Sequence, residues 1–310
     1  MIKINSSYKY LLFFFTLIAV ISFSEISNSQ DARSPECAAT IVITANESLC
    51  ETTPTTQKIT IYKVAFCTAV PTVPTSTTAT GMTSCSTVFE NTAGSLVTIQ
   101  KGIGTTPDGT FTEPPFGNYV YAYVELSPVL AYKASLVFTT AKALSSTTAL
   151  NTGGGSTTCR TNGTNNFYWD TLRGITCGDG LAAADTTNTM NSFDNNEALY
   201  GGTLTDGTNS GTTHLYLIQS NGTLASNSVS GAVASGANAA KAVAKLIFFV
   251  PMTANITPDT TGYNLLYNNT RGMIVWLNNN GPLVNGNTTV NGSFNIGFNA
   301  AYFDMSFQIQ

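Results

Sequence analysis

Charged side chains are scarce in this chain of 310 residues, because Asp, Glu, Lys and Arg together make up only 10% of it. Typical soluble domains contain roughly 25%. The formal net charge is −4, with no cluster of basic residues. This excludes the electrostatic footprint of a protein that binds nucleic acid or anionic lipid, so we expect neither partner. Thr, Asn, Ser and Gly carry the polarity instead, as is common on extracellular β proteins.

Recognisable catalytic motifs are also missing. The only histidine, His214, lies inside a strand-like pattern and is expected to be structural. There is no G-x-S-x-G, H-E-x-x-H or P-loop motif. We therefore expect no enzymatic activity and no cofactor.

Acidic residues in one polar region leave two alternatives open. They could provide the paired carboxylates of a glycoside hydrolase or bind calcium, although solvated loop charges are the simpler interpretation. These acids are Asp170, Asp179, Asp185, Asp194 and Glu197.

Only one long hydrophobic run occurs, and it lies at the N-terminus. Lys3 and Lys9 precede the apolar run Leu11 to Phe23, and Ser27 and Ser29 provide small residues for cleavage. The run is shorter than the about 20 residues of a spanning helix, so residues 1–29 are predicted to be a signal peptide. A retained N-terminal anchor is the alternative. We expect a mature chain without a transmembrane segment, secreted or at the cell surface, or periplasmic in a Gram-negative host.

Six cysteines follow the predicted signal, and an even number in an exported chain predicts three disulfides. Sequence alone allows many pairings. We favour sequential bridges because the last two then enclose loops of equal length. A zinc site is disfavoured, since there is no C-x-x-C pair. The predicted bridges are Cys37 with Cys50, Cys67 with Cys85, and Cys159 with Cys177.

The clearest secondary-structure signal is the stretch Asn118 to Leu126, which alternates without a fault. Tyr119, Tyr121 and Tyr123 are expected on one face, opposite Val120 and its apolar partners. Prolines bound the stretch on both sides, which indicates a strand that ends there. We predict a central, half-buried strand.

Further strand patterns and turns, without helical periodicity between them, predict an all-β fold of antiparallel β-sandwich type. In Lys58 to Phe66 the apolar phase slips at Tyr62 and Lys63, which predicts a β-bulge. In the final run, Phe303 to Ile309 predicts a last strand with Asp304, Ser306, Gln308 and Gln310 outward. The Ala-rich segment Ala232 to Leu246 is the one candidate for a short helix.

Strand patterns and a polar, Thr/Asn/Gly-rich stretch alternate along the chain and divide it into three parts after the signal. After the signal, residues 30–140 are predicted to form an N-terminal sandwich-like domain. Residues 141–210 form a Thr/Asn/Gly-rich region pinned by a disulfide. Residues 211–310 form a second β-rich part, and one possibility is that they complete the same sandwich.

One short stretch is similar to the Cna B type of bacterial surface domain, in which a glycine, a tyrosine, a strand glutamate, a proline and a tyrosine follow in this order. The resemblance implies that Glu125 could assist an isopeptide bond from Lys63 to an asparagine. The likeness is confined to this stretch. The matching positions are Gly117, Tyr119, Glu125, Pro128 and Tyr132.

These observations lead to three functional hypotheses. The first is a secreted, non-enzymatic structural or adhesive protein of the cell surface or an extracellular appendage, which self-associates through strand edges or binds other surface proteins. The second is a carbohydrate-binding module, and the third is a secreted glycoside hydrolase. For the second, the candidate residues for stacking on sugar rings are Tyr119, Tyr121, Tyr123, Phe167, Tyr168 and Trp169.

Overall fold

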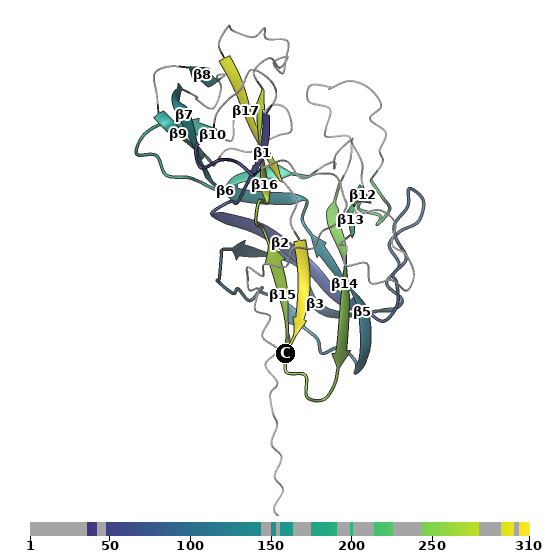
Figure 1. The fold of residues 1–310 in the computed structure, drawn as a ribbon. Helices are drawn as coiled ribbons and strands as arrows, with labels where there is room; N and C mark the ends of the chain where they lie inside the picture. Colours follow the sequence, from purple (N-terminus) through teal and green to yellow (C-terminus); the bar gives the residue numbers. More distant parts are fainter. Residues whose placement is uncertain are drawn as a thin grey trace, which may run out of the picture.

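The structure is a computed structural model that describes residues 36–41, 48–143, 150–152, 156–163, 175–190, 199–200, 214–225, 243–278, 293–300 and 304–310. These residues form β-strands in three sheets and contain no helix (Figure 1). All strand pairs within the sheets are antiparallel. The all-β, antiparallel prediction is confirmed. Most of the predicted helix, residues 232–242, lies outside the described residues, and Lys245 already belongs to a strand.

The largest sheet has nine strands and contains the predicted central strand as β5. The prediction that this strand is half-buried was wrong, because both of its faces are covered and all residues from Tyr121 to Leu126 are buried. Along its main path the order is β11-β6-β2-β5-β14-β13-β12, and β3 lies on the other edge of β2 and pairs with β4. Strands that lie far apart in the sequence, such as β2 and β14, are therefore part of one sheet. Its strands are β2 (Thr56–Cys67), β3 (Cys85–Ile99), β4 (Thr110–Phe111), β5 (Gly117–Leu126), β6 (Val129–Lys133), β11 (Thr186–Thr189), β12 (Leu199–Tyr200), β13 (His214–Ile218) and β14 (Lys245–Ile256).

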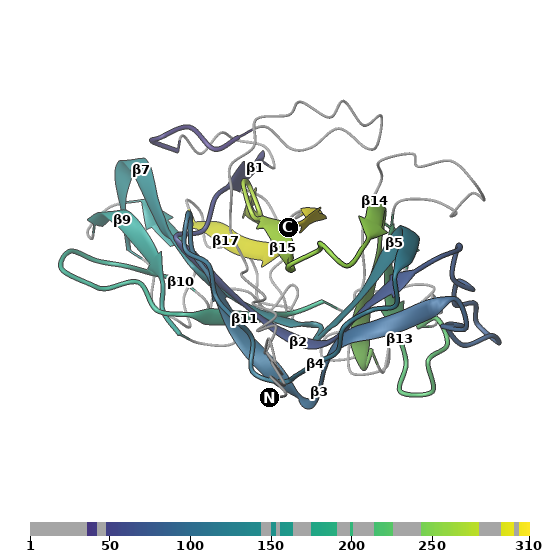
Figure 2. The ribbon, with the colours of Figure 1, turned by 90° about the horizontal axis from the view of Figure 1, so that it is seen from below.

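The second sheet has seven strands in the order β1-β16-β17-β8-β7-β9-β10, and a third contains only β15 and β18. Seen from below, the large sheet is strongly curved, and β15 and β17 lie on its inner side (Figure 2). These strands are β1 (Ser48–Thr52), β7 (Ser135–Ala143), β8 (Leu150–Thr152), β9 (Ser156–Thr161), β10 (Ile175–Cys177), β15 (Tyr263–Asn268), β16 (Met273–Asn278), β17 (Ser293–Ala300) and β18 (Asp304–Ile309).

The predicted irregularity in β2 is present. The register of β2 shifts between Ile61 and Lys63 against both β3 and β5. One extra residue restores the phase, so Ile59 and Ile61 before it and Val64 and Phe66 after it all pack in the same main core. The bulge therefore reconciles two apolar patterns that a regular strand would place on opposite faces.

The main core joins the inner face of the large sheet to β15, β16 and β18. Phe66 on β2 contacts Tyr263 on β15 and Phe307 on β18, with ring centroids 4.8 and 5.4 Å apart. On β18, Met305 is buried while Ser306 and Gln308 are exposed, and Gln310 directly after the strand is exposed too, as the alternation predicted. The large sheet and the β15–β18 pair are thus held together by apolar and aromatic side chains.

Three disulfides join the cysteines in the sequential pairing that was predicted. Cys67 and Cys85 are register partners in β2 and β3, and Cys159 and Cys177 are register partners in β9 and β10. Each of these bridges therefore fixes a directly opposed pair of strand residues. Disulfides of this number are typical of an oxidising, extracellular environment.

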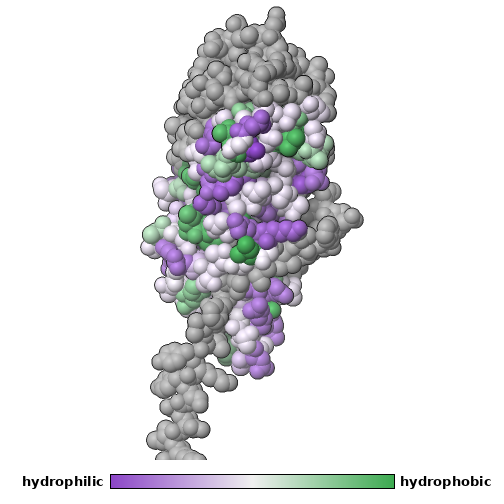
Figure 3. Space-filling view, turned by 90° about the vertical axis from the view of Figure 1, so that its left-hand side faces the viewer, coloured by the Kyte–Doolittle hydropathy of each residue, from purple (hydrophilic) through white to green (hydrophobic). Residues whose placement is uncertain are grey.

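The surface is mixed in polarity. On the face drawn in Figure 3, strongly apolar side chains form separate spots among near-neutral and hydrophilic ones. Among the residues that the structure describes, no helix has the length and apolar character needed to cross a membrane.

Candidate functional site

The outer face of the large sheet, opposite the main core, carries two neighbouring groups of side chains. Along β2, Ala65 and Cys67 belong to a second, smaller apolar cluster, and Lys63 precedes them on the same face. Alternation along β5 and β14 places Glu125 and Lys245 on this face as well, since Leu126 and Leu246 pack in the main core. One end of the face is therefore apolar and the other is charged.

The second apolar cluster is built from aromatic side chains. Phe249 lies between Tyr123 and Tyr216, with ring centroids 5.7 and 5.6 Å apart. The loop between Cys67 and Cys85 packs over this cluster through its partly buried apolar side chains. Burial, together with the nearby Tyr121, raises the pKa of Tyr216 to about 12. These covering side chains are Val70, Val73 and Met82.

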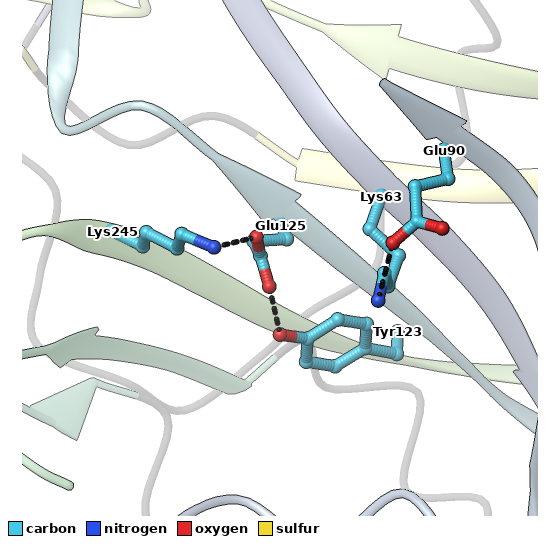
Figure 4. Close-up of polar contacts among 5 residues, drawn as sticks. All are labelled: Lys63, Glu90, Tyr123, Glu125 and Lys245. Carbon is cyan, nitrogen blue, oxygen red and sulfur yellow. Dashed lines mark hydrogen bonds and ion pairs between the residues drawn. The ribbon is translucent and has the colours of Figure 1, made fainter. Parts of the chain in front are cut away.

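At the charged end, Glu125 joins two partners (Figure 4). Its Oε2 accepts a hydrogen bond of 2.7 Å from the Tyr123 hydroxyl, and its Oε1 is paired with Lys245 Nζ. The Lys245 ammonium also lies 5.4 Å from the centre of the Tyr62 ring, within range of a cation–π contact. Burial, followed by the charge of Glu125 and the hydrogen bond to it, raises the pKa of Tyr123 far above its usual value.

Lys63 and Glu90 continue the polar contacts onto β2 and β3. Lys63 Nζ lies 2.7 Å from Glu90 Oε1. Lys63 is the register partner of Glu90 on one side and of Glu125 on the other. Glu90, Lys63, Glu125 and Lys245 thus lie on four adjacent strands, β3, β2, β5 and β14, with alternating sign. We call these four residues the charged row.

The charged row is accessible to differing degrees. The side chains of Glu90, Lys63 and Lys245 are 44%, 31% and 39% exposed, whereas that of Glu125 is 11% exposed. Each of the two carboxylates is paired with an ammonium group, which balances its charge, and the Glu125 carboxylate also accepts a hydrogen bond from a phenol. It is suited to an electrostatic contact with another surface.

The three strand tyrosines are all buried, between 2% and 4% exposed. Tyr121 and Tyr123 belong to the second cluster, but Tyr119 packs in the main core, 5.8 Å from Phe66. The expected single face of tyrosines is therefore interrupted. The β14 partner shifts register between Pro251 and Ala254, opposite this part of β5.

Stacking of these tyrosines on sugar rings stays a prediction. In this structure their rings are covered. The other stacking candidates, Phe167, Tyr168 and Trp169, lie outside the described residues.

The acids and the histidine that were considered for catalysis or metal binding are not gathered in one site. Asp185 pairs with Lys58 at 2.5 Å, and Asp179 Oδ1 accepts a hydrogen bond from the Ser156 hydroxyl. His214 is buried in β13. The described part of the chain has no group of three or more His, Cys, Asp and Glu side chains that could hold a metal ion. Three of the acids considered above, Asp170, Asp194 and Glu197, lie outside the described residues.

The isopeptide hypothesis can be compared with the contacts of its two residues. Lys63 and Glu125 are brought together as register partners, as that hypothesis requires. However, the Lys63 ammonium pairs with Glu90, and the Glu125 carboxylate is bonded to Tyr123 and Lys245. These contacts describe ion pairs rather than a lysine placed against an asparagine.

Sequence reasoning singled out Lys63 and Glu125 but missed Glu90 and Lys245. Only the order of strands across the sheet brings these two beside the others, and no local pattern encodes that order. Comparison with known proteins found no matching family, no similar curated protein and no similar solved structure.

Proposed function

We propose that the protein is a secreted, non-enzymatic structural or adhesive protein of the cell surface or of an extracellular appendage, whose copies associate through strand edges. The predicted signal peptide at residues 1–29 and the three disulfides support export to an oxidising compartment.

The use of charged groups supports a structural role. Four of the described acids form ion pairs with bases that are distant in sequence, and these include Lys58 with Asp185 and Arg271 with Glu51. Glu51 is 4% exposed, so the Arg271 partner serves to compensate a buried charge. These groups stabilise contacts between strands and loops rather than facing a substrate.

The observation that carries the proposal is the isolated β15–β18 sheet. Neither strand pairs with a third strand in the described part of the chain. The strand sequences, YNLLYN and DMSFQI, contain a single charge, Asp304, and no proline. Monomeric proteins usually protect such edges with lysine, proline or a bulge, because an unprotected edge pairs with another chain. β15 is buried from Tyr263 to Leu265, whereas Ser306 and Gln308 of β18 are exposed. The neutral edge that favours association by strand addition is therefore that of β18.

The experiment follows the mass of the purified mature protein over a wide range of concentration, by size-exclusion chromatography with light scattering and by electron microscopy. We expect oligomers or fibres. Gln308→Lys adds a charge to exposed β18 and should reduce assembly. Thr139→Lys is the matched control, because Thr139 is exposed but lies on β7, which has a neighbour on each side.

A protein that stays monomeric at all concentrations and does not adhere to cells would contradict this function. Equal assembly of wild type and Gln308→Lys would contradict the role of the β15–β18 edge.

A further inference from the structure

The charged row alternates in sign, and this alternation has no role in the strand-edge association proposed above. Read from β3 to β14, its signs run minus, plus, minus, plus, as Glu90, Lys63, Glu125 and Lys245. Reversing the order of such a row exchanges every sign. A row with this property is complementary to a reversed copy of itself.

A two-fold axis produces this reversal. If the axis runs parallel to the strands between β2 and β5, Glu90 of each copy faces Lys245 of the other. Lys63 of each copy likewise faces Glu125 of the other. The interface then has four contacts, all between opposite charges. They are of two kinds, and each kind occurs twice, as an isologous interface requires. A two-fold axis along the row would instead oppose like charges, so the signs select one orientation.

Apolar side chains lie beside the row, on the side away from the Cys67–Cys85 loop. Leu96 is 65% exposed and Val129 is 42% exposed. Leu96 is the register partner of Thr60, and its neighbour Val97 packs in the main core, so Leu96 lies on the outer face. Val129 lies on the same face, because the next residue of β6, Leu130, packs in the main core. Exposed apolar groups can be buried in an interface, and complementary charges beside them contribute specificity.

We propose that the charged row, with Leu96 and Val129, is a contact surface for a second copy of this chain, related by a two-fold axis parallel to the strands. The contact rests on the association proposed above, but it is separate from the β15–β18 edge. Because the Cys67–Cys85 loop stands on the same face, the two copies meet at their charged ends and diverge toward the loops.

The first test exchanges charges without changing their number. Lys63→Glu combined with Glu90→Lys keeps the pair within each copy and leaves the net charge unchanged. The row then reads plus, minus, minus, plus, so all four contacts between copies become like-charged. Self-association through this face should weaken about tenfold or more. Glu125→Lys combined with Lys245→Glu gives the opposite row, so a mixture of the two double variants should associate again.

The second test needs no substitution. A zero-length carbodiimide cross-linker is applied to a mixture of isotope-labelled and unlabelled wild-type copies, and cross-linked peptides are identified by mass spectrometry. Within one copy, Glu90 and Lys245 are three strand spacings apart, about 14 Å between backbones. A Glu90 to Lys245 cross-link that joins labelled and unlabelled peptides is the expected result. It should become weaker as salt is added, since partly exposed charges are screened.

The outcomes separate the two proposals. If copies associate but no mixed Glu90 to Lys245 cross-link forms, this contact is overturned while strand-edge assembly stands. Association that is unchanged by the Lys63 and Glu90 exchange also overturns it, provided that circular dichroism shows the variant folded. Absence of any association overturns both.

Discussion

The two strand-to-strand disulfides offer a matched test of how the outer face is covered. Both span 18 residues, and each joins a fully buried cysteine to a half-buried partner. They differ in the loop that they close. The Cys67–Cys85 loop packs on the second aromatic cluster, so replacing Cys67 and Cys85 by alanine should cost more than replacing Cys159 and Cys177.

The size of the difference follows from two contributions. In the chain-entropy model, opening a loop of this length costs about 3 kcal/mol for either bridge. If the Cys67–Cys85 loop then detaches, three partly buried apolar side chains leave the cluster, at roughly 1 kcal/mol each. The expected loss is therefore about 3 kcal/mol for the Cys159–Cys177 variant and up to about 6 kcal/mol for the Cys67–Cys85 variant.

Thermal unfolding measures this difference. For a chain of this length, 3 kcal/mol corresponds to roughly 5 °C in Tm. The Tm should therefore fall by about 5 °C in the Cys159–Cys177 variant and by up to about 10 °C in the Cys67–Cys85 variant. Detachment should also make the tyrosines of the second apolar cluster more accessible, so that a soluble quencher reduces their fluorescence more strongly. Equal losses of stability for the two variants, with the tyrosines still protected, would refute the idea that the loop stabilises the cluster.

Three further predictions concern single residues. Tyr123→Phe should lower the free energy of unfolding by about 1–3 kcal/mol, because a buried Glu125 oxygen loses its donor; in urea titrations its effect should not add to that of Glu125→Gln. Because burial raises the pKa of Tyr216 to about 12, above about 10 in the unfolded chain, the folded state holds this proton more tightly. The contribution of Tyr216 to stability is then constant below pH 10 and is lost as the pH rises to 12. A pH titration of tyrosinate absorbance in which every tyrosine ionises near pH 10 with the fold intact would contradict this prediction. Gly94→Ala should cost about 1–3 kcal/mol, because Gly94 has φ +86° and a Cβ there would lie 2.5 Å from a side-chain atom on β2; Gly102→Ala, with φ +73° and open space around it, should lower Tm less.

Local patterns predicted the elements of this fold well where the signal was periodic. The stretch Asn118 to Leu126 is β5, between β2 and β14, and the phase slip at Tyr62 is a bulge. The disulfide pairing was also predictable, because sequential bridges close short loops between neighbouring strands. These features depend on residues that are close in sequence.

The charged row was not predictable to the same extent. Lys63 and Glu125 were identified, but Glu90 and Lys245 become their neighbours only through the strand order β3-β2-β5-β14. Tyr119 was expected beside Tyr121, and an irregularity that involves the distant β14 separates them. Strand order and cross-strand irregularities are set by long-range packing, which a single sequence does not display.

The position of β14 beside β5 has a consequence for biosynthesis. β5 ends at Leu126, but its partner on that side begins only at Lys245. More than a third of the polypeptide must therefore be synthesised after β5 before its neighbour β14 is available. Late pairing of this kind slows folding and leaves the nascent chain prone to aggregate. A chaperone that shields that strand until β14 is available would reduce this risk.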